Sequence, residues 1–446
     1  MSHLYRHPEG HVFYRHMGHG RPKVAYGEGI YLYDESGKRF IDGSGGPFVV
    51  NVGHGRREIV EAMSQQAQAT AYVHANMFTS EPIERYSAAM AELVPLPDAR
   101  FFYLSSGSEV VEGALKLARQ IQLARGETSR SRIISRHQSY HGMTLGALGV
   151  SGRPGLRAPY QDMLPTSIHI DPPYPYRDSR TGEELAHLLE RAINKAGAET
   201  VAAFIAEPIS GAGLGACIPP DDYWPAIREI CTRCGVLLVV DEVFVGMGRT
   251  GKWWAINHWD VEPDILVTSK GTAGGYFPFG FIAARGDDVH MIFEQLGDFN
   301  HGGTFSHHAV GAAAALATLD IIQRENLIDN AAQQGYYLGQ LLADAFDAHP
   351  HVGDIRGRGL FWTLEFVQDK AKRTPFPAGK RLAQTVWQAA FERGLIVYEA
   401  QGCADGQNGD LIHVGPPLIV NAAQLEEIVR LLAATVDDVL PRNQSL

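Results

Sequence analysis

The sequence predicts an α/β fold with a large, doubly wound, mainly parallel sheet and a second, smaller α+β domain. Short apolar runs alternate with amphipathic helical segments over roughly 200 residues after Arg100, which is the pattern of repeated strand–helix units. Several of these runs stop abruptly at a charged residue, as strands buried on both faces do at the edge of a parallel sheet. After a long helical segment, Ala309–Asn326, the pattern changes to short strands between separate amphipathic helices.

Composition limits the class of protein. A chain of 446 residues with 45% hydrophobic and 20% charged residues is typical of a globular enzyme. The formal net charge of -11 argues against a nucleic acid or an anionic membrane as partner. Four cysteines are too few for a disulfide framework, so we expect a cytoplasmic protein. The histidine-rich N-terminus has no apolar run, and no residues show the spacing of metal ligands, so we expect neither a signal peptide nor a metal.

We expect residues 1–55 to form an arm and a hairpin that belong to the smaller domain. Tyr31–Asp42 consists of two alternating segments around Ser36-Gly37, which favours a β-hairpin. The glycine-rich stretch Gly43–Gly55 follows as a loop, and helices are expected at about 57–69 and 81–93.

The large domain is expected at 56–325 and the C-terminal part of the small domain at 326–446. Helices are predicted at Ser108–Gln122 and Tyr223–Gly235, and Phe279–Ala284 resembles an antiparallel return strand. The remaining predicted strands are Phe101–Leu104, Ile133-Ile134, Val201–Ala206, Val236–Val240 and Ile265–Val267 in the large domain, and Val352–Phe366, Leu395–Tyr398 and Leu411–Val414 in the small one.

Three charged residues follow predicted strands: Glu207, Asp241 and Lys270. A buried charge costs several kcal/mol unless it is paired, so each of them needs a partner or a ligand. Pyridoxal phosphate would use both an acid and a lysine. Its aldehyde forms a Schiff base with a lysine amine, and its pyridine nitrogen needs a carboxylate to stay protonated. The alternative is a set of structural carboxylates and a solvated lysine at strand ends.

Two further segments could contribute to such a site. Ser106-Gly107-Ser108 opens a predicted helix, where free N–H groups and a glycine favour a phosphate. The alternative is an ordinary N-cap at Ser108. Tyr140-His141 follows another strand, and its aromatic ring could stack on a pyridine ring. The alternative for this pair is loop packing.

With these residues in place, the sequence resembles the class III pyridoxal-phosphate-dependent aminotransferases, or ω-transaminases, from about Tyr31 to Pro417. The resemblance implies the fold type I of pyridoxal-phosphate-dependent transferases and a homodimer, or a tetramer built from it, with active sites shared between subunits. It rests on six motifs in the family's order, namely Ser106-Gly107-Ser108-Glu109, Tyr140-His141-Gly142, Ala206-Glu207-Pro208, Asp241-Glu242-Val243 with Gly248-Arg249-Thr250-Gly251, Lys270-Gly271, and His301-Gly302-Gly303-Thr304-Phe305.

By this resemblance, Lys270 holds the cofactor and moves the substrate proton, and Asp241 pairs with the pyridine nitrogen. Val243 and Tyr140 enclose the ring. Glu207 is expected near the phenolic oxygen of the cofactor. The other implied site residues are Ser106, Gly107, Ser108 and, from the other subunit, Thr304 at the phosphate; His141 beside the cofactor; and Phe48 in the substrate pocket.

One departure from the family concerns the substrate. Many members carry a mobile arginine that binds the keto-acid carboxylate, but the corresponding loop here, Gly402–Asn408, contains no arginine. Either another arginine takes this role, with Arg153 as our prediction, or the substrates lack an α-carboxylate.

The predicted function is a ping-pong transfer of an amino group from an amine or amino acid to a keto acid or aldehyde. The alternatives are another pyridoxal-phosphate reaction on the same fold (an aminomutase, an epimerase or racemase, or a decarboxylase) or a non-catalytic protein that keeps the fold.

Overall fold

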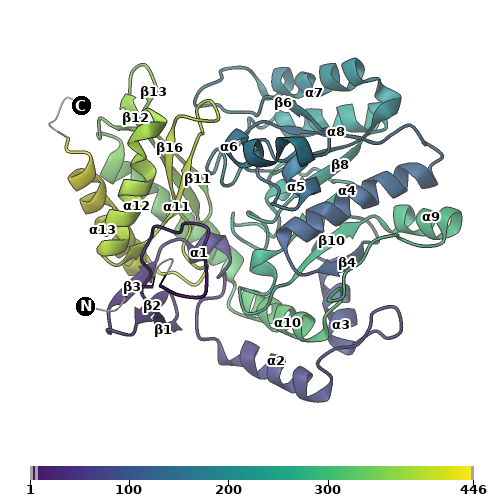
Figure 1. Cartoon of the computed structure of the whole chain (residues 1–446), viewed down its shortest axis with the longest axis horizontal. Coiled ribbons are helices and arrows are strands. Elements are labelled where there is room, and N and C mark those ends of the chain that lie inside the picture. The colour runs from purple at the N-terminus through teal and green to yellow at the C-terminus, as the bar shows by residue number, and fades with distance from the viewer. Residues whose placement is uncertain (1–3, 6–8, 443–446) are drawn as a thin grey trace.

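The computed structural model describes residues 4–5 and 9–442, so the ends of the predicted arm and of the C-terminal segment lie outside the described residues. Its centre is a seven-stranded sheet, on the right in Figure 1. The prediction of a mainly parallel sheet is confirmed: only β10 runs antiparallel to its neighbours, as expected of a return strand. The order across the sheet is β4 (Arg100–Leu104), β10 (Gly280–Ala284), β9 (Ile265–Thr268), β8 (Leu237–Asp241), β7 (Val201–Ala206), β5 (Arg132–Arg136) and β6 (Ile168–Ile170).

The central strands β7, β8 and β9 are mainly apolar because both faces of the sheet are covered there. In β8, Leu238 and Val240 belong to one buried cluster, and Leu237 and Val239 belong to the other. Helix α4 (Gly107–Ala124) covers the second face. The other helices of this part are α2 (Arg57–Ala69), α3 (Glu81–Ala91), α5 (Leu145–Val150), α6 (Pro154–Arg157), α7 (Gly182–Ala196), α8 (Tyr223–Cys234), α9 (Gly286–Leu296) and α10 (Ala309–Arg324).

Two smaller sheets lie on the left in Figure 1 and combine the two ends of the chain. The arm before them contacts α12 (Leu382–Glu392), where the His19 ring lies beside Trp387. One sheet contains β1 (Val24–Glu28), β2 (Tyr31–Asp34), β3 (Arg39–Asp42) and β14 (Leu395–Ile396); the other contains β11 (Val352–Arg358), β12 (Phe361–Asp369), β16 (Asp410–Val414) and β15 (Tyr398–Gln401), with β13 (Thr374–Pro375) beside β12. The remaining α-helices are α1 (Gly45–Phe48), α11 (Leu327–Phe346), α12 (Leu382–Glu392) and α13 (Ala422–Val439).

Two strand predictions were wrong. Val352–Phe366 is a hairpin of β11 and β12, because the chain reverses at Gly359, whose φ of 57° favours glycine. Leu395–Tyr398 is divided between two sheets: Leu395 pairs with Ile41 in β3, and Tyr398 pairs with His413 in β16. The predicted hairpin at Tyr31–Asp42 is confirmed as β2 and β3.

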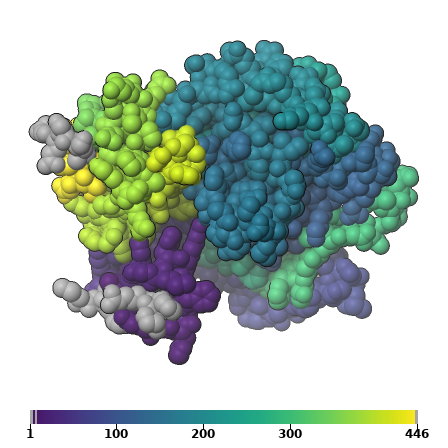
Figure 2. Space-filling model, turned by 45° about the horizontal axis from the view of Figure 1, so that its top comes forward, coloured from purple at the N-terminus to yellow at the C-terminus, as the bar shows by residue number. Residues whose placement is uncertain are grey.

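The C-terminal third of the chain packs directly on the central part, as the green and yellow surface against the blue and teal surface in Figure 2. Gly406, in the loop before β16, lies against the Pro154 ring at the start of α6. Within residues 4–5 and 9–442, no helix is both long and apolar enough to cross a membrane.

Candidate active site

Lys270 lies directly after β9, at the start of a short 3-10 helix (Lys270–Thr272), beyond the C-terminal edge of the large sheet. Its side chain is half-buried, and Nζ lies 4.0 Å from the centre of the Phe244 ring. Burial lowers the pKa of this amine from 10.5 to about 7, against the opposing effects of Asp241 and Glu207. The amine is therefore largely neutral above neutral pH, which is the form that attacks an aldehyde.

Asp241 ends β8 and faces the same edge of the sheet. Its Oδ2 lies 2.7 Å from His141 Nδ1, and its Oδ1 accepts a hydrogen bond of 3.0 Å from the N–H of Val243. Both the carboxylate and the imidazole are buried. The backbone N–H of His141 donates a hydrogen bond of 2.8 Å to Ser151 Oγ, which anchors the loop that carries the imidazole.

The neighbouring carboxylate, Glu242, points away from this site. Successive side chains of a strand face opposite sides, and Glu242 instead accepts hydrogen bonds from the N–H groups of Ala255 and Ile256, at 3.0 and 2.8 Å. Burial raises its pKa to about 8. Of the two adjacent acids, only Asp241 can serve a cofactor.

Glu207 follows β7 and brings a third ionisable group to this edge. Its Oε1 accepts a hydrogen bond of 3.0 Å from the N–H of Gly211. Its Oε2 is buried and has no hydrogen-bond partner among the described residues. Burial raises the pKa of this carboxyl, while His141 and Arg136 act in the opposite direction. An unpartnered buried oxygen is costly, which indicates a site for a ligand's polar group.

The N-terminus of α4 forms another wall of the site. Ser106, not Ser108, is the N-cap, with its side chain accepting a weak hydrogen bond of 3.4 Å from the N–H of Glu109. Ser108 Oγ instead accepts from the N–H of Met143 at 3.0 Å, which ties the helix to the Tyr140-His141-Gly142 loop. A Cβ at position 107 would lie 2.9 Å from Val243 Cγ1, so the glycine lets α4 approach the end of β8.

Phe48 and Arg153, which were predicted to bind the substrate, both lie near aromatic side chains. Phe48 is 2% exposed, and its ring packs against Phe244 and Phe361, with centroid distances of 4.4 and 4.9 Å. Arg153 donates one hydrogen bond of 3.0 Å to the carbonyl of Gln401. Burial lowers the pKa of Arg153, whereas Tyr398, Glu399 and Tyr140 raise it. The guanidinium therefore lies close enough to both tyrosines to interact with them electrostatically.

Thr304 is not gathered into this site within the chain. It is exposed, in the loop between α9 and α10. Ser106, Gly107 and Ser108 lie at the N-terminus of α4, whereas Asp241 ends β8, and Val243 and Lys270 follow β8 and β9.

Two residues of the site, Phe244 and Arg249, were not predicted from the sequence. Phe244, under the Lys270 amine, carried no signal beyond its place after Val243. Arg249 lies in a motif that the resemblance included, but its role was not predicted. This arginine is buried and donates to the carbonyls of Leu360, Gly415 and Pro416 and to Asn51 Oδ1, and so holds the loop of Phe48 beside Lys270.

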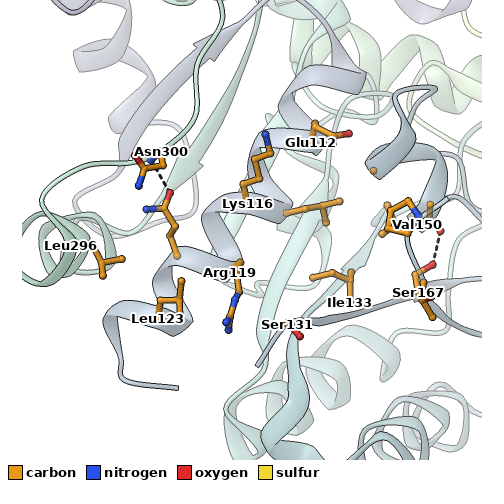
Figure 3. Close-up of a pocket in the computed structure, with 16 residues that line it drawn as sticks. Glu112, Lys116, Arg119, Leu123, Ser131, Ile133, Val150, Ser167, Leu296 and Asn300 are labelled. Atoms are coloured by element: carbon orange, nitrogen blue, oxygen red, sulfur yellow. Dashed lines mark hydrogen bonds between the residues drawn. The ribbon is translucent and has the colours of Figure 1, made fainter. Parts of the chain in front are cut away.

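A separate cavity of about 570 Å³ lies on the outer side of α4 (Figure 3). Glu112, Lys116 and Arg119 line it from the helix, and Ile133, Val150 and Ser167 line it from the opposite side. None of the predicted site residues contributes to its lining. It is therefore distinct from the Lys270 site.

Comparison with known proteins agrees with this geometry. Residues 16–436 match the model of the family Aminotransferase class-III. The chain belongs to this family. An uncharacterised aminotransferase of Schizosaccharomyces pombe is 39% identical, over 96% of this chain and 95% of its own. The putrescine–pyruvate aminotransferase of Pseudomonas aeruginosa is 33% identical over 93% and 90%. A solved structure of the omega transaminase of Pseudomonas jessenii in complex with PMP has a TM-score of 0.89 and 32% identity, covering 98% of both chains.

This class III aminotransferase depends on pyridoxal phosphate, and its residues fit that cofactor. The site contains a lysine amine with a pKa near neutrality, a buried carboxylate fixed by an imidazole, and a helix N-terminus opened by glycine. The unpartnered Oε2 of Glu207 leaves an acceptor for a further polar group. The predicted fold type I and the predicted transamination are both confirmed by the family and its solved members.

Proposed function

We propose that this transaminase carries out both half-reactions of amino transfer at Lys270, with Asp241 as the second essential group. The observation that carries the proposal is the pairing of a lysine amine of lowered pKa with a buried, histidine-bound carboxylate at one sheet edge. An amine or amino acid donates nitrogen in the first half-reaction, and a keto acid accepts it in the second.

When bound, pyridoxal phosphate supplies an electron sink for the bond that breaks at the substrate carbon. Lys270 Nζ would hold the cofactor through its aldehyde and, once free, would carry the proton of the substrate carbon. Asp241 Oδ2 would keep the pyridine nitrogen protonated, and His141 holds Asp241 in place. Val243 and Tyr140 would enclose the ring, and Glu207 would lie near the phenolic oxygen.

The phosphate would bind at the N-terminus of α4. The first N–H groups of a helix lack intrahelical acceptors and carry partial positive charge. Gly107 admits a close approach, and the hydroxyls of Ser106 and Ser108 lie at the same end. Thr304 of a second subunit would complete the phosphate site.

Replacing Lys270 tests the core of the proposal. Lys270→Ala should abolish turnover and the borohydride-stable link to the cofactor, while the protein still folds. Lys252→Ala, which removes an exposed lysine on a neighbouring turn, should leave both unchanged. Near-wild-type turnover in Lys270→Ala, or a borohydride adduct on another lysine, would reject Lys270 as the residue that binds the cofactor.

A single-turnover experiment tests the reaction class. With an amine donor alone, a transaminase releases one carbonyl product and loses the visible absorbance of its cofactor. An epimerase, a decarboxylase or an aminomutase returns the absorbance without stoichiometric carbonyl release.

We also propose that Arg153 binds the carboxylate of the keto acid. The Gly402–Asn408 loop has no arginine, whereas Arg153 lies near Tyr140 and Tyr398 and, within the described residues, donates a single hydrogen bond, to the carbonyl of Gln401. Arg153→Ala should raise the KM for pyruvate at least tenfold, by about 1.4 kcal/mol or more, and spare a carboxylate-free amine. Arg157→Ala, which removes a donor to backbone carbonyls of α5, is the control. Equal losses toward both substrates would reject the assignment.

The proposal includes a homodimer in the cytoplasm. Apolar side chains are exposed around the Thr304 loop: Tyr72 at 42%, Phe78 at 62% and Phe305 at 61%. Large exposed apolar side chains in one region favour a protein interface. A reducing compartment is supported by the four cysteines, all of which are free.

A further inference from the structure

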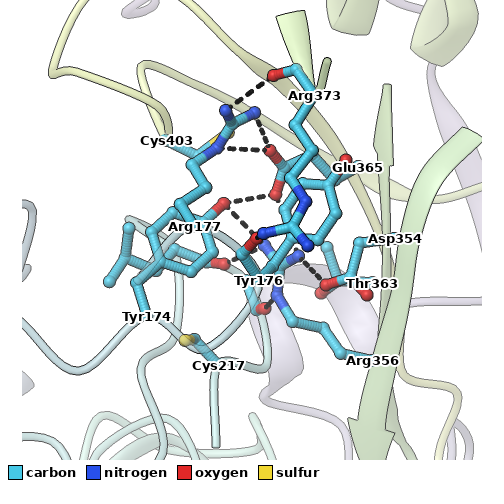
Figure 4. A network of polar contacts seen from close by, with 12 residues as sticks. Tyr174, Tyr176, Arg177, Cys217, Asp354, Arg356, Thr363, Glu365, Arg373 and Cys403 are labelled. Atoms are coloured by element: carbon cyan, nitrogen blue, oxygen red, sulfur yellow. Dashed lines mark hydrogen bonds and ion pairs between the residues drawn. The ribbon is translucent and has the colours of Figure 1, made fainter. Parts of the chain in front are cut away.

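A buried polar network connects the smaller sheet that contains β11 and β12 to segments of the large domain (Figure 4). Its centre is Arg356 of β11, whose Nη1 lies 2.6 Å from Asp354 Oδ2 and 2.9 Å from Glu365 Oε2. Glu365 is buried in β12 and also accepts hydrogen bonds from Arg177. A buried carboxylate with two arginines keeps its charge, and these arginines lower the pKa of Glu365.

Arg356 also reaches outside its own sheet. Its Nε donates to the carbonyl of Gly215 at 2.6 Å, and its Nη2 donates to the carbonyl of Leu214. Both carbonyls belong to the segment that follows Glu207 at the end of β7. The planar guanidinium therefore holds two consecutive carbonyls on one side and two carboxylates on the other, which a lysine ammonium cannot do.

The segment Glu207–Cys217 lies against the proposed catalytic groups. Gly211 donates its N–H to Glu207 Oε1. Gly213 leaves no room for a side chain, because a Cβ there would lie 1.6 Å from the carbonyl oxygen of Gln138, two residues before Tyr140. Displacement of this segment would move both the Glu207 carboxyl and the backbone next to Tyr140.

We propose that Arg356 is a positioning residue of the transaminase: it fixes the Glu207–Cys217 segment and, through it, the Glu207 carboxyl in the active site. The inference rests on the proposed role of Glu207. In this view, the sheet that contains β11 and β12 supports the catalytic centre, although Arg356 itself does not contact the reacting atoms.

Arg177 provides a matched control. It binds the same carboxylate, Glu365, from the segment after β6, and its Nη1 donates to the carbonyl of Arg373. No hydrogen bond joins Arg177 to the Glu207–Cys217 segment in the described part of the chain. Arg177→Lys therefore disturbs the same ion-pair network without releasing Leu214 and Gly215.

The first test uses amide hydrogen exchange of the full chain without cofactor. Arg356→Lys should speed exchange in the peptide 208–217 at least tenfold, and Arg177→Lys should leave that peptide at the wild-type rate. Gly215→Ala is an independent route to the same effect, because its Cβ would lie 2.6 Å from Thr363 Cγ2 and would shift the carbonyl that Arg356 holds. Unchanged exchange in folded Arg356→Lys, or equal changes in both arginine variants, would overturn the anchoring role.

The second test is kinetic and asks whether Arg356 acts through Glu207. Arg356→Lys should lower kcat/KM about tenfold and shift the pH midpoint of the cofactor's visible absorbance in the direction that Glu207→Gln shifts it. The kcat/KM of the double variant should lie within about threefold of that of Glu207→Gln alone, because the effects of two residues that act through one group do not add. Additive losses would overturn the coupling. Faster exchange at 208–217 with normal kinetics would keep the anchor but reject Glu207 as a catalytic group.

Discussion

Lys270 combines a strained backbone with a half-buried amine. Its φ of 48° lies in the left-handed region, which costs a non-glycine residue about 1 kcal/mol or more. The surrounding segments hold it there: a Cβ on the following Gly271 would lie 2.3 Å from Asn51 Nδ2. The rest of the fold offsets the cost of both the strained backbone and the desolvated amine. The strained backbone places the amine at the sheet edge, and desolvation keeps it neutral there.

The lowered pKa of Lys270 predicts a pH-dependent stability of the cofactor-free protein. The amine titrates at about 7 when folded and at 10.5 when unfolded, so the unfolded state binds more protons between these values. Below about pH 7 the folded protein bears the full cost of a buried charge, and stability rises with pH up to about 10.5. Lys270→Met should therefore stabilise the protein against urea most at about pH 6, and less at about pH 9. An equal gain at both pH values would contradict the lowered pKa.

Asp241 and Glu242 form a natural comparison of two adjacent buried acids. Asp241→Asn cannot hold the proton of the pyridine nitrogen, so it should slow the first half-reaction by about a thousandfold or more, or about 4 kcal/mol. Glu242→Gln should retain the rate, because that carboxyl only accepts two backbone hydrogen bonds. Stopped-flow absorbance of the bound cofactor measures both. A loss of less than tenfold in Asp241→Asn would make that carboxylate structural.

The positions of Lys270, Asp241 and Glu207 at one edge of the sheet could be predicted from sequence, because each charge follows an apolar run, but their surroundings could not. Their catalytic roles stay predictions. Period-two alternation implies that Asp241 and Glu242 face opposite sides, but it does not say which one faces the cofactor. Phe244 and Arg249 act through contacts with Phe48 and Asn51, far away in sequence, and no local pattern announces such contacts.

At the scale of secondary structure, the strands of the large sheet were predictable because burial on both faces leaves an unbroken apolar run. The strands of the smaller sheets were not resolved equally well. Val352–Phe366 contains Gly353, Gly357 and Gly359, and the local pattern does not mark which of them is the turn, because a glycine within a strand pattern also fits a bulge. At Leu395–Tyr398 the chain passes from one sheet to another with only Val397 between the two strands.

The junction of α4 with β8 predicts a specific sensitivity at Gly107. A methyl group there would lie 2.9 Å from Val243 Cγ1 and would push the helix N-terminus away from the strand end. Gly107→Ala should weaken cofactor binding about tenfold or more, about 1.4 kcal/mol, with little change in helix content. Gly155→Ala, at a helical glycine with open space around it, is the control. Fluorescence titration of the cofactor-free protein measures the Kd; unchanged affinity would contradict the proposed phosphate site.

At the scale of the whole molecule, the exposed Thr304 loop is where the proposed second subunit is expected to pack. Thr304 belongs to a family motif but is exposed in a single chain, beside the rings of Phe305 and Tyr72, whose centroids are 6.2 Å apart. The cavity on the outer side of α4 approaches the same loop, since Lys116 Nζ lies 3.5 Å from His301 Nδ1. The division into segments 1–55, 56–325 and 326–446 stays a prediction.

A charge at Phe305 should disrupt this assembly. Phe305→Asp places a carboxylate in the apolar region and should shift the protein from dimer to monomer, with loss of activity that high protein concentration partly restores. Phe293→Asp is the matched control, because Phe293 is 68% exposed but lies on α9. Light scattering after size-exclusion chromatography gives the mass. A stable dimer of Phe305→Asp would place the interface elsewhere.

The pairing of β3 with β14 has a consequence for biosynthesis. Ile41 and Leu395 lie side by side in one sheet, although most of the chain separates them. At a synthesis rate of about 5 to 20 residues per second, the N-terminal hairpin waits roughly 20 to 70 s for its parallel neighbour to leave the ribosome. During that time the three N-terminal strands present an unpaired edge, which chaperones can protect. Ribosome-bound chains that stop before Leu395 should therefore be cleaved by protease near residues 24–42, and chains released at full length should resist cleavage there.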